Sequence, residues 1–338
     1  YGMVVLNGSF RDVESALFGA QSLRLGLAFG VMFIAAQLPP RFYVRWAPII
    51  YGTGVVLLLA VLLFGVTVKG SQRWLEIPGV TRFQPSEIMK IAVPLMVAWY
   101  FRDRPLPPRV RDLAVALAIV FVPAILVIRQ PDLGTGLLIS VGGLSVIVLA
   151  GLSWRWIAGA VAGVACAAPI AWQFMHGYQR QRILTLFDPE SDPLGSGWNI
   201  IQATTAIGSG GVFGKGLGGG TQSKLEFLPE SHTDFVIAVI GEEFGLVGVT
   251  MLLLLYVAVL ARGLYVATES GDTFGRLVSG GLSLIFFVYV FVNIAMVCGL
   301  LPVVGVPLPL VSYGGTSAIT LLAGFGILMS VYTHRGWR

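Results

Sequence analysis

Long apolar blocks separated by short polar connections dominate this sequence. Blocks of about 15 to 25 residues suit membrane-spanning helices, and they lack the alternation over about ten residues that is typical of barrel strands. Nine blocks fall at about 20–38, 46–68, 86–101, 113–128, 137–151, 157–175, 234–261, 277–299 and 314–332. The short run YGMVVL at 1–6 indicates the end of one more helix. The pattern predicts an all-α, polytopic integral membrane protein with ten transmembrane helices, the first truncated in this chain.

Composition supports the membrane assignment. Of 338 residues, 56% are hydrophobic and only 12% are Asp, Glu, Lys or Arg, with a mean hydropathy of +0.82. An average soluble domain carries roughly 25% charged residues, so soluble enzyme folds are excluded. The net charge is +5, but no basic stripe interleaved with aromatic residues indicates nucleic-acid binding. Cys166 and Cys298 both lie in apolar blocks, which excludes a disulfide framework or a zinc-type spacing.

The basic residues predict the orientation of the chain. Eleven Lys and Arg side chains fall in the connections on one side of the membrane, at 39–45, 102–112, 153–156, 262–276 and 333–338. By the positive-inside rule this side is cytoplasmic, and both termini lie there. The connections at 69–84, 129–136, 176–233 and 301–315 then face outward. The segment 176–233 is predicted as a large extracytoplasmic loop, and its length favours a functional role.

Four ionisable residues at the edges of apolar blocks are the first candidates for chemistry, because charges at membrane depth are costly. Glu87 and Lys90 stand in PSEIMK, Asp132 in RQPDLGT and Asp234 in SHTDF, all on the predicted outer side. A purely structural role remains the alternative for each of these residues. Glu87 suits the first turn of a helix with Lys90 as an i,i+3 partner, and Asp234 resembles part of a capping box.

A glycine-rich segment, 195–224, carries Lys215 and follows Arg180. Glycine lets backbone N–H groups approach an anion, and the nearby cations favour a phosphate. The segment fails the P-loop pattern at both ends, and a hinge-rich loop remains the alternative. No transition-metal spacing occurs, so no metal ligand or cofactor is assigned, although carboxylates could hold Mg²⁺ or Mn²⁺.

Prolines at 302, 307 and 309 interrupt helicity before Ser312, which indicates either a cavity facing outward or a tight turn.

An enzyme on the outer face has no nucleotide supply, so its substrate must carry its own leaving group, as a lipid-linked sugar pyrophosphate does. A transporter needs charges near the midplane and access from both sides instead, whereas the inner halves of these helices are nearly free of ionisable groups and Arg24 is the one that the sequence does not place.

Long motifs resemble the SEDS family of shape, elongation, division and sporulation proteins. They are PSEIMKIAVPL (85–95), RQPDLGTG (129–136), YQRQRI (178–183), DPESDPLGSGWNIIQ (188–202), GTQSKLEFLPESHTDFVIAVIGEEFGLVG (220–248) and GLLPVVGVPLPLVSYGGTS (299–317). The resemblance covers nearly the whole chain, 1–338, as a single membrane domain. DPESDPLG, GTQSKLEFLPE and VVGVPLPLVSYGG are more similar to the elongation branch than to the division branch.

The resemblance implies a peptidoglycan glycosyltransferase of the bacterial cytoplasmic (inner) membrane with an extracytoplasmic active site. It would polymerise lipid II into undecaprenyl-pyrophosphate-linked glycan, with inversion, alongside a class B penicillin-binding protein and the elongation machinery. It implies Asp234 as general base, and Glu87 and Lys90 as the family's acid and lysine pair. Substrate contacts are expected from Asp132, Arg73, Arg180, Lys215 and Ser312. A lipid II flippase and a division-type polymerase are the alternatives.

Overall fold

The computed structural model describes residues 11–68, 71–76, 82–175, 177–192, 195–221 and 233–335. The truncated helix predicted at 1–6 lies outside these residues. The chain divides into two compact units, which are described separately. Unit 1 comprises 1–21, 153–257 and 289–313, and unit 2 comprises 22–152, 258–288 and 314–338.

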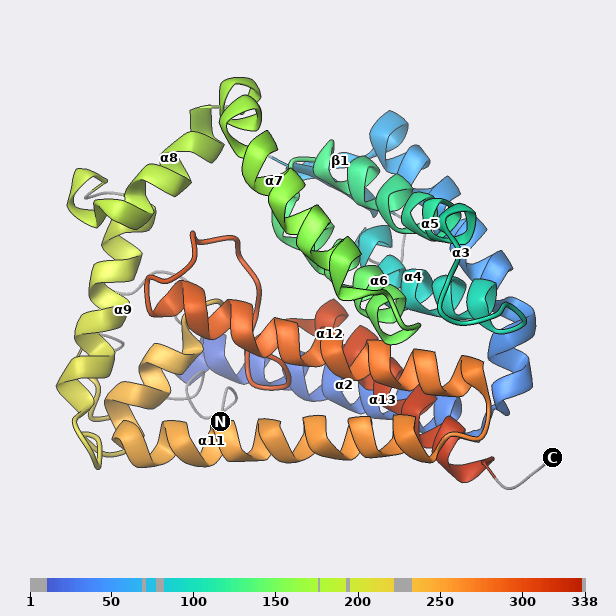
Figure 1. Ribbon diagram of the computed structural model, residues 1–338. Coiled ribbons are helices and arrows are strands. Elements are labelled where there is room, and N and C mark those ends of the chain that lie inside the picture. Colours follow the sequence, from blue (N-terminus) through green and yellow to red (C-terminus); the bar gives the residue numbers. More distant parts are fainter. Residues whose placement is uncertain are drawn as a thin grey trace. The chain divides into compact units, whose positions relative to one another are not determined.

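Unit 2 is built from apolar helices that surround one central helix, α4 (Figure 1). Its helices are α2 (Arg11–Gln37, from Ser22 onward), α3 (Pro40–Phe64), α4 (Pro85–Phe101), α5 (Val110–Ile128), α6 (Leu133–Leu149) and α13 (Gly315–Thr333). The later part of α11 (Val236–Glu269) and the earlier part of α12 (Thr273–Val297) complete the unit.

Helix α4 lies at the centre of the hydrophobic core of unit 2. It packs against α3, α5, α6 and α13, and 12 of its 17 residues are buried. Pro85 occupies the first turn, where the missing N–H leaves no bond unmade, and Glu87 complements the helix dipole there. The same helix therefore carries both core packing and the buried charges of the PSEIMK motif.

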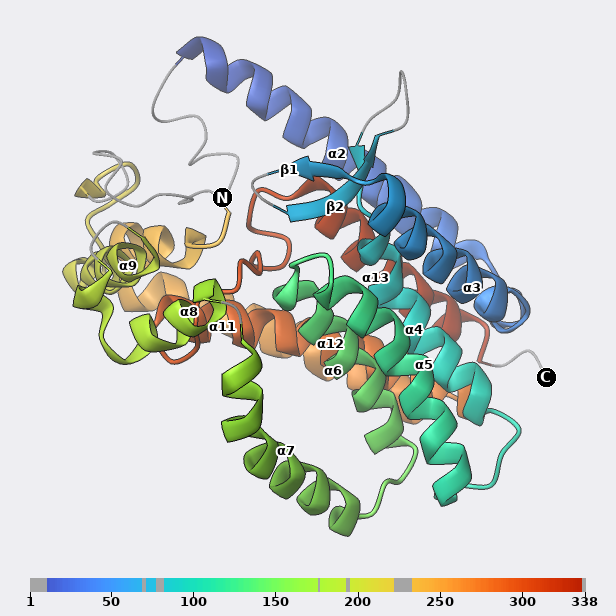
Figure 2. The same ribbon diagram turned by 90° about the horizontal axis from the view of Figure 1, so that it is seen from above.

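A small antiparallel sheet follows α3, where the sequence pattern predicted helix as far as 68. Strands β1 (Val66–Val68), β2 (Ser71–Glu76) and β3 (Arg82–Phe83) pair in the order β1-β2-β3 (Figure 2). The helix prediction was wrong at 65–68 because α3 ends at Phe64, where the Gly65 N–H binds the Val61 carbonyl at 2.8 Å. The β-branched run Val-Thr-Val then favours an extended strand.

Unit 1 contains most of the segment predicted as a long outer loop. Its elements are α7 (Trp154–Phe174), α8 (Gly177–Phe187), the 3₁₀ turn η1 (Pro189–Ser191), α9 (Ser196–Gly210) and the first parts of α11 and the last part of α12. The first half of the glycine-rich segment is therefore helix α9 rather than a hinge-rich loop. Its Ile and Ala side chains bury one face, with Ala203 and Ala206 fully buried.

The nine predicted apolar blocks each correspond to a helix. Five helices in the described part of the chain are long and apolar enough to cross a membrane. Helix α11 continues to Glu269, so the predicted connection 262–276 is shorter than expected, because no strong helix breaker precedes Ser270-Gly271. A kink at Gly245, with φ 63°, interrupts α11.

Close packing of α6 in unit 2 depends on glycine. A Cβ added at Gly143 would meet the Val120 and Val93 side chains within 3 Å. We expect Gly143→Val to lower the free energy of unfolding by about 1 to 3 kcal/mol through overpacking, measured as a lower thermal unfolding temperature in detergent. The matched control is Gly52→Ala in α3, where a Cβ meets nothing within 4 Å. Equal stability of both variants would contradict the packing described here.

Candidate functional site

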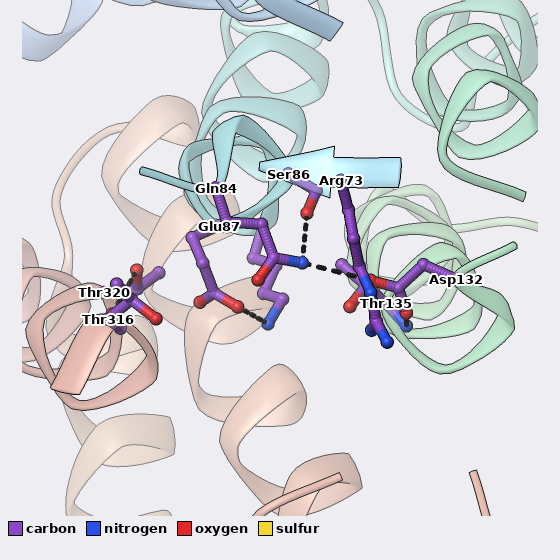
Figure 3. Close-up of polar contacts among 9 residues, drawn as sticks. Arg73, Gln84, Ser86, Glu87, Asp132, Thr135, Thr316 and Thr320 are labelled. Carbon is purple, nitrogen blue, oxygen red and sulfur yellow. Dashed lines mark hydrogen bonds and ion pairs between the residues drawn. The ribbon is translucent and has the colours of Figure 1, made fainter. Parts of the chain in front are cut away.

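Asp132 joins three elements of unit 2 (Figure 3). It is the N-cap of α6, where its Oδ1 accepts from the Thr135 N–H at 3.1 Å. Its Oδ2 accepts from Gln84 Nε2 at 3.0 Å and lies 3.3 Å from Arg73 Nη1 on β2. Since both oxygens are engaged, the buried carboxylate ties the strand and the start of α4 to α6.

Glu87 and Lys90 form a buried ion pair one turn apart on α4. Lys90 Nζ donates to Glu87 Oε1 at 2.6 Å, and the two side chains are 5% and 9% exposed. Glu87 Oε2 is buried without a hydrogen-bond partner among the described residues. An exposed pair at this spacing contributes only a few tenths of a kcal/mol, whereas here desolvation makes each charge depend on the other.

Helix α13 borders the Glu87 side of this cluster. Figure 3 shows Thr316 and Thr320 on the side of Glu87 that faces away from Asp132. At the start of α13, a Cβ on Gly315 would come within about 3 Å of the Arg24 side chain. Arg24, which the sequence left without a place, therefore packs against the first turn of α13, at the same end of that helix as Thr316.

Asp234 lies in unit 1, two residues before α11 begins. It is partly buried. Its main-chain carbonyl accepts from Asn293 Nδ2 at 2.9 Å, and the same nitrogen donates to the Val306 carbonyl at 2.7 Å. Gly305 has φ 75°, and a Cβ there would stand 3.4 Å from Asp234 Oδ2. The glycine thus lies directly beside the carboxylate and places no side chain against it.

Ser312 holds the same loop against the Asp234 segment. Its hydroxyl donates to the Thr233 carbonyl and accepts from the Leu308 N–H at 2.8 Å. Between them Leu310 adopts a left-handed φ of 62°, which costs a non-glycine residue about 1 to 3 kcal/mol. The buried hydroxyl is therefore engaged with backbone in this structure, and its predicted substrate contact stays a prediction.

Lys215 pairs with a buried carboxylate of α11. Its Nζ lies 2.8 Å from Glu242 Oε1, which also accepts from the Thr221 N–H at 2.8 Å. The Lys215 N–H binds the Glu242 carbonyl at 3.0 Å, and the Gly216 N–H binds the Glu243 carbonyl at 3.0 Å. Lys215, Gly216 and Thr221 of the glycine-rich segment are thus bonded to α11, close to its kink. Glycine is required at Gly214, where φ is 78° and a Cβ would meet backbone of α11.

Arg180 on α8 caps the end of α7. Its Nε and Nη2 donate to the carbonyls of Trp172 and Gln173 at 2.9 and 2.7 Å. These bonds satisfy carbonyls that the last turn of a helix leaves open. These two bonds do not test the predicted contact between Arg180 and a phosphate.

No group of three or more His, Cys, Asp and Glu side chains among the described residues could hold a metal ion. The Mg²⁺ or Mn²⁺ that carboxylates could hold therefore remains an expectation from the sequence.

Within each unit the structure brings several predicted residues together. In unit 2 Arg73 and Gln84 both contact Asp132 Oδ2, and Figure 3 shows Gln84 between Asp132 and Glu87, which is paired with Lys90. In unit 1 the structure joins Ser312 to the Asp234 segment. Gln84 and Asn293 were missed by sequence reasoning. Asn293 could have been found as a lone amide inside an apolar block, but Gln84 carries no such signal.

Comparison with known proteins identifies relatives over the full length. Residues 3–336 match the FtsW/RodA/SpoVE family, described as cell cycle proteins. The chain is 55% identical to the peptidoglycan glycosyltransferase MrdB of Escherichia coli K12, covering 98% of this chain and 90% of that protein. It is 38% identical to MrdB of Helicobacter pylori, covering 93% and 83%.

Solved structures agree with these relatives. One chain from work on the coordination of polymerization and crosslinking by a peptidoglycan synthase complex superposes with a TM-score of 0.87 at 33% identity, covering 100% of this chain and 95% of that chain. The rod shape determining protein RodA of Thermus thermophilus gives a TM-score of 0.74 at 30% identity, covering 100% and 93%. The chain belongs to the FtsW/RodA/SpoVE family.

Proposed function

We propose that this chain polymerises lipid II into glycan strands at the outer face of the bacterial cytoplasmic membrane, with Asp234 as the general base. The chain is a membrane-embedded peptidoglycan glycosyltransferase, on the strength of its 55% identity to an enzyme of that name along nearly the whole length of both proteins. To this activity the proposal adds lipid II as the substrate, the outer side of the membrane as the place of reaction, and the roles of individual residues.

The observation that carries the choice of Asp234 is the position of its carboxylate beside a glycine. Gly305 presents no side chain to Asp234 Oδ2, and a Cβ there would stand 3.4 Å from that oxygen. A carboxylate that takes the proton of the 4-hydroxyl of GlcNAc makes that oxygen a stronger nucleophile. Attack on the anomeric carbon of the terminal MurNAc then inverts it, and undecaprenyl pyrophosphate leaves.

We assign to Lys90, the cation of the buried Glu87–Lys90 pair, the positive charge that such a leaving group needs. A developing pyrophosphate is stabilised by a preorganised cation in a site with little water. The Lys90 side chain is 5% exposed and paired with Glu87, so its ammonium group is held in one position. We assign to Lys90 the contact with the phosphate, and to Glu87 the fixing of Lys90.

The partner in the proposal is a class B penicillin-binding protein of the elongation machinery. The support is the likeness to a chain from a peptidoglycan synthase complex. A division-type polymerase is the second candidate, since the chain is also 37% identical to a probable FtsW of Geobacter sulfurreducens over 91% of this chain. The higher identity to MrdB favours the elongation enzyme.

Asp234→Asn is expected to abolish polymerisation and leave folding intact. Asn keeps the size of the side chain but cannot accept a proton, and general base catalysis contributes about 10² to 10⁴-fold. The measurement is glycan length from lipid II with purified enzyme, beside its thermal stability. A stable Asn variant that makes long glycan would eliminate Asp234 as the base.

Lys90→Met should lower both stability and activity, because it leaves the Glu87 carboxylate buried without its cation, at a cost of about 3 to 5 kcal/mol. Adding Glu87→Gln removes that charge and should restore thermal stability without restoring polymerisation. The control is Arg104→Met, which breaks the partly exposed Arg104–Asp112 pair of the same unit and should polymerise normally. If the double variant regained full activity, Lys90 would have no role beyond neutralising Glu87.

Labelling of introduced cysteines tests the orientation. In a chain with Cys166 and Cys298 replaced, since both are exposed, we expect Gly208→Cys in α9 to react with an impermeant thiol reagent outside intact cells. Gly208 has open space around it. Arg109→Cys in the basic connection 102–112 should react only after permeabilisation. The reverse pattern would place the glycine-rich segment inside the cell.

A further inference from the structure

Asn293 is a fully buried amide in the apolar helix α12. Its Nδ2 donates to two main-chain carbonyls, that of Asp234 at 2.9 Å and that of Val306 at 2.7 Å. A carboxamide has two N–H donors, and both are used. The reversed amide would put an oxygen against two carbonyl oxygens, so the orientation of the side chain is fixed by its partners.

The backbone at Asp234 needs such a partner because the helix does not supply one. The Ala238 N–H binds the Phe235 carbonyl at 2.9 Å, whereas a regular α-helix would pair it with the carbonyl four residues earlier, at Asp234. The Asp234 carbonyl accepts from the side chain of Asn293. The position of this residue depends on a contact made by a different helix.

A second contact from the 302–312 segment holds the preceding residue. Ser312 Oγ donates to the Thr233 carbonyl. The segment is itself held by Tyr256, whose hydroxyl donates to the Pro309 carbonyl at 2.8 Å. Two successive carbonyls, at 233 and 234, are therefore each bonded to a side chain from elsewhere in unit 1, and Gly305 of the same segment faces Asp234 Oδ2.

One atom of Asn293 is left without a partner. Its Oδ1 is buried and accepts no hydrogen bond from any described residue. Buried polar atoms are rarely left so, and each exception calls for a reason. A Leu at this position would fill the same space without an orphan oxygen but would lose both donors, so the contribution of the amide lies in its two N–H bonds.

We propose that Asn293 is a positioning residue for Asp234: its amide fixes the Asp234 main chain to the Val306 carbonyl, so that the base and the neighbouring Gly305 keep one geometry. The inference rests on the proposed function of Asp234 as the base. Asn293 acts through Asp234 and touches no reacting atom. Loss of the amide should therefore reduce turnover more than substrate binding.

The test compares Asn293→Leu with Asn293→Gln in the purified full-length enzyme. Leu removes both donors at similar volume, and Gln keeps two donors on a longer arm. Because small misplacements of reacting groups can cost about 10²-fold, we expect Leu to lower kcat per folded molecule by about 30-fold or more, with KM for lipid II within about threefold. Gln should recover part of the loss. The folded fraction is measured by size-exclusion chromatography and thermal unfolding.

The matched control is Ser283→Ala, a buried polar residue of the same helix whose hydroxyl bonds only to the Ser279 carbonyl within α12 among the contacts recorded. It should keep the kcat of the wild type. If Asn293→Leu does not fold, Ser312→Ala removes the neighbouring bond to Thr233 and should lower kcat by about tenfold at nearly constant KM.

The outcomes separate this inference from the proposed function. A folded Asn293→Leu enzyme with the kcat of the wild type, beside an inactive Asp234→Asn, overturns the positioning role alone. A fall in activity that follows only the folded fraction also overturns it. An active Asp234→Asn enzyme overturns the proposed base itself.

Discussion

A charged side chain at membrane depth is stable only where protein groups replace the water that it has lost. In unit 2 that requirement pairs Lys90 with Glu87 at 2.6 Å and surrounds Asp132 with donors from Thr135, Gln84 and Arg73. These bonds bring strand β2 and helices α4 and α6 together at one end of the core. The charged residues proposed for the chemistry thus also hold the ends of these elements together.

In unit 1 the groups that need hydrogen-bond partners are main-chain carbonyls rather than charged side chains. The Asp234 segment precedes the regular part of α11, so its carbonyls must find donors elsewhere. Asn293 and Ser312 provide them, and Leu310 of the same loop has a left-handed backbone. Further along α11, the Glu242 carboxylate accepts hydrogen bonds from Lys215 and from the Thr221 N–H. A carboxylate placed at the end of such a network has little freedom to move.

The length of the apolar blocks was sufficient to predict a helix at each of nine positions and the all-α class, because the thickness of the membrane sets that length. It failed at 65–68, where local β-branched residues end α3, and in the 195–210 segment, where glycine content concealed helix α9. The length of an apolar block does not show where the helix inside it ends, and it does not reveal a helix in a glycine-rich segment outside the blocks.

The candidate site could be predicted in part. Glu87, Lys90, Asp132 and Asp234 could be selected from the sequence because they are ionisable residues in apolar surroundings. Placing a charge there costs free energy, so such residues are rare. Their partners could not be read from the sequence. Asn293 is 59 residues from Asp234 along the chain, and Gln84 is 48 from Asp132, so only the folded chain shows which donor meets which carbonyl or carboxylate.

The most direct test of the central claim uses the purified wild-type enzyme with lipid II as the only source of sugar and no nucleotide. The products are separated on a gel, with and without the penicillin-binding partner, and movement of labelled lipid II across vesicle membranes is followed in parallel. The account predicts glycan polymer, because the substrate carries its own pyrophosphate leaving group. Lipid movement across the vesicles without any polymer would contradict it and would support a transporter.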